Sequence, residues 1–114
     1  MSESTTLPAE LLDWAREQEP HRRAAVQLLV EHEHWFNRRD FLESDAVYRD
    51  PDGAYLRFTR ARELFEQGAF PASSSEQAVL DLAIALGEDR YRLAGLGPAH
   101  RDMLRTALAT ALDS

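Results

Sequence analysis

The sequence predicts a mainly α-helical (α+β) domain, in which about five helices surround a central buried helix at residues 74–86 and one β-hairpin occupies residues 45–58. Three observations support this prediction. Residues 73–87 are almost wholly apolar, apolar residues elsewhere recur at spacings of three and four, and residues 45–58 alternate around a turn sequence. A chain of 114 residues is expected to form one domain, here residues 7–114, preceded by a flexible N-terminus at residues 1–6.

The central helix carries its own start signal. Ser73 and Glu76 have the spacing of a capping box, in which each side chain binds a free backbone N–H of the first turn. Gly87 is expected to end the helix. Apolar side chains lie all round it, so we expect neighbours on several sides and Leu82 buried against at least two other helices.

Two helices are expected before the hairpin. The first runs from Leu7 to Gln18 with an apolar face made of Leu7, Leu11, Trp14 and Ala15. Pro20 suits the first turn of a second helix, which continues to about Phe36 and packs antiparallel against the first.

The hairpin has a specific turn chemistry. Pro51 presets the backbone for a turn, Asp50 and Asp52 can accept local N–H groups, and Gly53 can take a positive φ. On the second strand Ala54, Leu56 and Phe58 share the core face, whereas Tyr55 and Arg57 share the other. Thr59 is then expected to cap a short helix from Arg60 to Gln67, with Gly68 after it.

The C-terminal part ends in another helix. Pro98 begins it, and Leu104, Ala107, Leu108 and Ala111 repeat at helical spacing. Before it, Arg90–Leu93 is either a loop or a short third strand.

Composition limits the cellular setting and the partners. The net charge is −7, no cysteine is present, and all 13 basic residues are arginine, as in the proteins of GC-rich bacterial genomes. An acidic chain disfavours general nucleic-acid binding. The polar N-terminus and the lack of a long apolar run predict a cytoplasmic protein that does not enter a membrane.

No motif predicts catalysis, a cofactor or a metal. Glu31 and His34 have the i, i+3 spacing used in dimetal bundles, but those sites need two such motifs and further carboxylates. On a continuous helix the rings of His32 and His34 would point in opposite directions. A nucleophile elbow, a dinucleotide-binding fingerprint and a calcium loop are all absent, so we expect a non-enzymatic protein without tight divalent metal. An anion pocket at the last helix start, formed by Arg90, Arg92, His100 and Arg101, is left open.

The function favoured is a protein–protein interaction or regulatory module, self-associating or binding another protein. Aromatic and arginine side chains are the usual interface anchors. The hairpin, whose strand edges lack partners, and the end of the second helix supply six candidates: Trp35, Arg38, Arg39, Tyr48, Tyr55 and Arg57. The alternative is a nucleic-acid-associated regulator that gathers Arg22, Arg23, Arg38 and Arg39 on one side.

Overall fold

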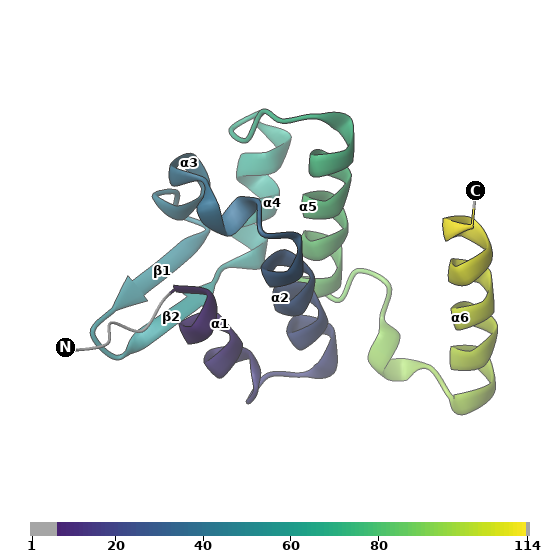
Figure 1. The fold of residues 1–114 in the computed structure, drawn as a ribbon. Coiled ribbons are helices and arrows are strands. Elements are labelled where there is room, and N and C mark those ends of the chain that lie inside the picture. The colour runs from purple at the N-terminus through teal and green to yellow at the C-terminus, as the bar shows by residue number, and fades with distance from the viewer. Residues whose placement is uncertain (1–6, 114) are drawn as a thin grey trace.

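The protein is described by a computed structural model covering residues 7–113, so the prediction for residues 1–6 lies outside the described residues. The fold class is confirmed as mainly α with one antiparallel hairpin (Figure 1). The described chain has six α-helices and two short 3₁₀ helices, in the order α1 Leu7–Ala15, α2 Pro20–His32, η1 Trp35–Asn37, α3 Arg39–Leu42, β1 Val47–Asp50, β2 Gly53–Leu56, α4 Phe58–Glu66, α5 Ser74–Gly87, η2 Leu93–Gly95 and α6 Pro98–Leu112.

The start of α5 is as predicted. The Ser73 hydroxyl accepts a hydrogen bond from the Glu76 N–H at 3.2 Å, and the Glu76 carboxylate accepts one from the Ser73 N–H at 3.0 Å. Both halves of the capping box are therefore present.

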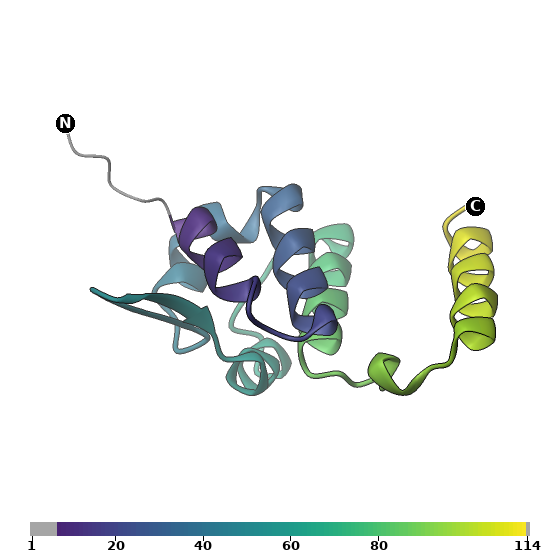
Figure 2. The same cartoon turned by 90° about the horizontal axis from the view of Figure 1, so that it is seen from below.

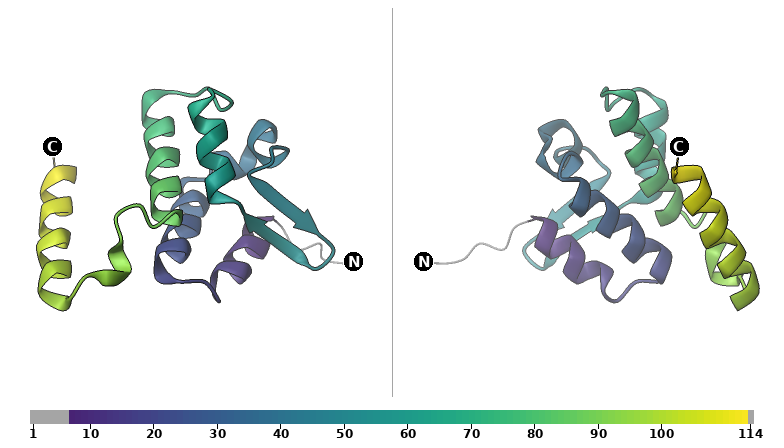
Figure 3. Two further views of the ribbon diagram at one scale, coloured as in Figure 1. Left: turned by 180° about the vertical axis from the view of Figure 1, so that it is seen from behind. Right: turned by 45° about the vertical axis from the view of Figure 1, so that its right-hand side comes forward.

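Helix α5 is packed between α2 and α4 (Figure 1, Figure 3). His21, at the start of α2, bonds the Leu86 carbonyl near the end of α5, and Trp35, just after α2, donates to the Glu76 carbonyl near its start. These two contacts show that α2 and α5 run antiparallel. Gly87 is needed for close approach to α4, because a Cβ there would lie 2.1 Å from the Phe58 ring.

The prediction that Leu82 is buried is wrong. Its side chain is 46% exposed, and Ala78 one turn earlier is exposed as well. The helices α2 and α4 cover one side of α5 and leave the opposite apolar side free. Composition showed that α5 could be surrounded, but not that this chain supplies neighbours on every side.

The hairpin prediction is confirmed. Tyr48 pairs with Tyr55 and Asp50 with Gly53, which leaves Pro51 and Asp52 as the turn. The Asp50 carboxylate accepts from the Asp52 N–H at 2.8 Å, and Gly53 has a φ of +145°. Within residues 7–113 the sheet has these two strands, so the third strand considered at Arg90–Leu93 does not form.

Helix α4 begins earlier than predicted. Phe58 is its first residue and Arg57 precedes it, so Thr59 lies inside the first turn and caps nothing. Phe58 is still buried, because the start of α4 turns its ring toward Gly87 and Trp14.

Both helices before the hairpin are shorter than predicted. The first ends at Ala15 rather than Gln18, because the N–H groups of Glu17 and Gln18 bond carbonyls three residues earlier, at 3.3 and 3.0 Å, and form a turn. Glu33 adopts a left-handed conformation with a φ of 57°, which ends α2 at His32. The chain then forms η1 and the four-residue α3, which the sequence did not predict. This change of direction carries Trp35 and Phe36 into the core.

Helix α6 forms where predicted, but it stands apart from the rest of the fold (Figure 1, Figure 2). It has no buried residue, unlike the other five α-helices. None of the helices in residues 7–113 is long and apolar enough to cross a membrane.

The capping box predicts that the stability of the fold decreases at acidic pH. The hydrogen bonds from Ser73 lower the pKa of Glu76 below its usual 4.5. A carboxylate whose folded-state pKa is lowered stabilises the fold above its unfolded pKa, and this contribution is lost as the pH falls through the folded-state pKa. We therefore expect the free energy of unfolding to decline below about pH 4.5 and the Glu76→Gln variant to decline less steeply, as measured by urea denaturation at a series of pH values.

The matched control is Glu66→Gln, which removes an exposed carboxylate on α4. It should keep the wild-type pH dependence. Identical pH profiles for the wild type and Glu76→Gln would contradict a role for the Glu76 cap.

Candidate functional site

Three of the six candidate residues meet on the outer face of the hairpin. The Tyr48 and Tyr55 rings form a cross-strand pair with centroids 4.8 Å apart. The Arg57 guanidinium lies 5.0 Å from the Tyr48 ring and 5.9 Å from the Tyr55 ring. Because Ala54 and Leu56 turn to the core, the alternation predicted for β2 places these polar and aromatic groups outward.

Helix α1 adds a fourth side chain, Trp14, beside these three residues. The helix packs across β2, and the Trp14 ring lies 6.1 Å from Tyr55 and 6.5 Å from Phe58. Trp14 is half-buried rather than enclosed, because its position flanks the buried row formed by Leu7, Leu11 and Ala15. Trp14 and Tyr55 together form an aromatic ridge between α1 and the hairpin.

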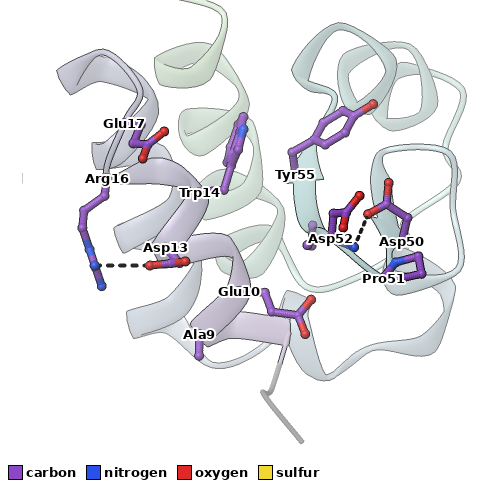
Figure 4. A pocket seen from close by; sticks show the side chains of 12 residues that line it. Ala9, Glu10, Asp13, Trp14, Arg16, Glu17, Asp50, Pro51, Asp52 and Tyr55 are labelled. Atoms are coloured by element: carbon purple, nitrogen blue, oxygen red, sulfur yellow. Dashed lines mark hydrogen bonds and ion pairs between the residues drawn. The ribbon is translucent and has the colours of Figure 1, made fainter.

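An open hollow of about 740 Å³ lies on one side of this ridge. We call it the α1–hairpin hollow. Figure 4 shows α1 on one side and the hairpin turn on the other, with Trp14 and Tyr55 at the same end. Five carboxylates and one guanidinium line it: Glu10, Asp13, Glu17, Asp50, Asp52 and Arg16. Its volume lies within the usual range of ligand pockets.

The carboxylates of the hollow differ in how they are neutralised. Glu10 pairs with Arg49 of β1 through contacts of 3.1 and 2.9 Å, and Asp13 pairs with Arg16 in an exposed contact. Hydrogen bonding to the Asp50 carboxylate raises the pKa of the Tyr48 hydroxyl. Within the described part of the chain, Glu17, Asp50 and Asp52 form no ion pair, so the hollow is negatively charged.

A second hollow, of about 610 Å³, lies on the other side of the ridge. Trp14 and Tyr55 border it as well, but its charged groups are Arg22, Arg57 and Glu88. The ridge therefore separates an acidic surface from a mixed one.

The other three candidates lie elsewhere. Trp35 is fully buried against the rings of Phe41 and Phe70, so its side chain has no surface to present to a partner. Arg38 stacks on Trp35 at 4.7 Å and donates to the Pro71 carbonyl, which makes it part of the support for that core. Arg39 is exposed and pairs with Glu43. The end of the second helix is thus removed from the candidate surface.

The two histidines of the Glu31–His34 segment come closer than expected. Since Glu33 ends α2, the rings of His32 and His34 lie 5.5 Å apart instead of on opposite sides of a helix. His34 also lies 3.5 Å from the Glu76 carboxylate. Among residues 7–113 no group of three or more histidine, aspartate or glutamate side chains is placed to hold a metal ion.

The arginines proposed for nucleic acid or anions do not gather. Arg22 and Arg23 are in the first turn of α2, whereas Arg38 and Arg39 follow its far end, roughly 20 Å away along a helix of this length. At α6, Arg101 lines a hollow that Arg90, Arg92 and His100 do not reach. Arg90 instead lies 3.6 Å from Glu88.

Comparison with protein-family models, curated proteins and solved structures finds no significant match. The function is therefore inferred from the geometry of the site itself. Sequence reasoning missed Trp14 and the acidic side of α1. The signal was the spacing of Glu10 and Asp13 by three residues, which puts two carboxylates on one face of that helix, with Glu17 in the turn that follows it.

Proposed function

We propose that the protein is a non-enzymatic interaction module that binds a basic segment of a partner protein in the α1–hairpin hollow and on the adjoining Trp14–Tyr55 ridge. The observation that carries the proposal is the negatively charged hollow with the Trp14–Tyr55 ridge at one end. An arginine or lysine side chain matches both features, because its charge suits the carboxylates and its cation and stem pack on aromatic rings. Tyrosine and tryptophan also provide contact area at a low entropic cost.

Neutralising the hollow is the direct test. Glu17→Gln with Asp52→Asn removes two carboxylates that form no ion pair in the described structure. We expect at least a tenfold loss of affinity for a fluorescent peptide of alternating arginine and glycine, measured by anisotropy at low salt. A control double variant, Glu66→Gln with Glu31→Gln, makes the same change in net charge on exposed residues outside the hollow that likewise form no ion pair in the described structure.

Removal of the ridge gives an independent prediction. Tyr55→Ala should weaken peptide binding several-fold while the unfolding transition stays cooperative, because the ring is 37% exposed and faces away from Leu56. Tyr91→Ala is the matched control, since Tyr91 is exposed in the linker before α6. Equal affinities for the wild type and both hollow and ridge variants would overturn the proposal.

The nucleic-acid alternative is separated by the same assay. The acidic hollow disfavours phosphate, and the separation of the two arginine pairs along α2 offers no continuous basic surface there. Tight, salt-sensitive binding of a DNA or RNA oligonucleotide, weakened by Arg22→Gln with Arg23→Gln, would favour that alternative instead.

A further inference from the structure

Helix α6 presents a large apolar surface to solvent. Met103 is 65% exposed, Leu104 36%, Leu108 56% and Leu112 83%. A helix of this length is marginal in water without tertiary contacts, because helix formation has a costly nucleus. Its apolar side therefore needs a packing partner, and the views of the ribbon show α6 standing off the body (Figure 1, Figure 2, Figure 3).

The apolar arc of α6 is wide. At 100° per residue, the apolar positions run from Met103 and Ala107 through Leu104 and Leu108 to Leu112, so the arc spans about 180°. A helix that packs on one surface needs an apolar stripe of only about 100°. Helix α6 is thus suited to a position between two apolar surfaces.

The body exposes an apolar strip of its own. On α5, Ala78 and Leu82 are exposed and Val79 and Leu86 are half-buried. On α2, Ala24 and Leu28 are half-buried and follow His21 by three and seven residues, so they lie on the same side of α2 as His21, whose ring bonds the Leu86 carbonyl of α5. We call these residues the α2–α5 strip: Ala24, Leu28, Ala78, Val79, Leu82 and Leu86.

The linker holds α6 away from the α5 part of the strip of its own chain, and within the strip only Ala24 on α2 lies near α6. Asp89 and Arg92 have φ values of 54° and 52°, and the Asp89 carboxylate accepts from the Leu93 N–H at 3.1 Å. The Arg90 N–H also bonds the Ala85 carbonyl at 3.0 Å. Between the base of α6 and α2 this arrangement leaves an apolar hollow of about 330 Å³, bordered by Ala24, Leu104 and Leu108.

We infer that the protein forms a two-fold dimer in which α6 of each copy packs on the α2–α5 strip of the other, with the two α6 helices in contact near the axis. One chain carries both an uncovered apolar helix and an uncovered apolar strip, and a two-fold exchange covers both without a third molecule. The wide arc of α6 then has the strip on one side and the second α6 on the other.

Charge favours the same occupant. Helix α6 has two arginines and one aspartate, which gives it a net charge of +1. The whole chain has a net charge of −7, so the remainder of the chain has a net charge of −8. Asp81 lies beside Leu82 and pairs with Arg62 of α4 at 2.7 Å, and on α6 Arg105 pairs with Asp102. Arg101, which borders the apolar side of α6, forms no ion pair within residues 7–113 and is therefore the charge of α6 that remains for the acidic body of a second copy. A basic helix against an acidic body gives complementary electrostatics at the rim of the contact.

The apolar area that exchange would cover reaches the minimum for a specific dimer. The four apolar side chains of α6 together with Leu82 expose on the order of 500 Å² per copy. Two copies that exchange their helices would bury about 1,000 Å² from these side chains before other atoms are counted, which reaches the lower limit for a specific interface. The inference is independent of the α1–hairpin hollow, since no residue of α6 or of the strip lines it.

Light scattering with matched variants tests the inference. The wild type should have twice the 13.0 kDa mass of one chain at micromolar concentration. Leu108→Glu on the apolar side of α6 and Leu82→Glu on the strip should each raise the dimer Kd more than tenfold, whereas Thr106→Glu on the polar side should not. A wild type that is monomeric at high micromolar concentration, or a dimer unaffected by Leu108→Glu and Leu82→Glu, would overturn it.

A crosslinking experiment distinguishes exchange from closure of α6 on its own chain. The chain has no cysteine, so the double variant Leu82→Cys with Leu108→Cys introduces the two thiols that a short bis-maleimide can join. Exchange predicts crosslinked dimers, which also form when the two single-cysteine variants are mixed. Crosslinking confined to one chain, with no dimer on mixing, would contradict exchange.

Discussion

Replacement of Trp35 with alanine is expected to lower the free energy of unfolding by about 3–5 kcal/mol. The side chain is fully buried, its ring lies 5.9 Å from Phe41 and 6.0 Å from Phe70, and its Nε1 donates to the Glu76 carbonyl at 3.1 Å. The substitution removes these contacts, leaves a cavity and loses the hydrogen bond that joins η1 to the start of α5. Urea denaturation followed by far-ultraviolet circular dichroism measures the change.

Two further variants keep this prediction testable if Trp35→Ala does not fold. Trp35→Phe retains most of the ring packing and should cost about 1–2 kcal/mol, mainly through the lost Nε1 hydrogen bond. Tyr91→Ala, which removes an exposed ring in the linker, should change the stability by less than about 0.5 kcal/mol. A loss below about 1 kcal/mol for Trp35→Ala would show that the aromatic core does not organise this end of the fold.

Local signals in the sequence were sufficient for most elements. Ser73 with Glu76, and the prolines at positions 20 and 98, act within one helical turn, so their effect does not depend on the tertiary structure. The Asp50–Gly53 turn is equally local. The fold class and the starts of these helices could therefore be predicted from the chain.

The burial of particular side chains could not be predicted in the same way. Trp35 follows α2 with helical spacing, but the left-handed Glu33 redirects the chain and turns the ring inward. Leu82 belongs to the most apolar segment, yet α2 and α4 cover only the opposite side of it. An apolar residue indicates that burial is favourable, not that a neighbour within the chain provides it.

The candidate site was predictable only in part. Alternation along β2 placed Tyr55 and Arg57 on the outward face, where Tyr48 joins them. The acidic hollow depends on α1 packing across β2, which brings Glu10 and Asp13 opposite the hairpin turn. Such a contact between distant segments leaves no local pattern in the sequence.

The second large effect is expected at Leu80, for which Leu82 is the matched comparison two residues away. Leu80 is fully buried on the side of α5 that meets the core, whereas Leu82 is 46% exposed on the opposite side. Leu80→Ala should lower the free energy of unfolding by about 2–5 kcal/mol, because burial is lost and a cavity remains. Leu82→Ala should cost less than about 1 kcal/mol in dilute protein, where the copies are separated.

Repeating both measurements at several protein concentrations tests whether a second copy covers Leu82. If α6 of a second copy covers Leu82, the loss caused by Leu82→Ala grows as concentration rises, since a dimer adds a concentration-dependent term to stability. The loss caused by Leu80→Ala stays nearly constant, because α2 and α4 of the same chain pack on the core side of α5 at every concentration. Equal, concentration-independent losses for the two variants would mean that the chain itself buries Leu82. The inference that one side of α5 is uncovered within a single chain would then be wrong.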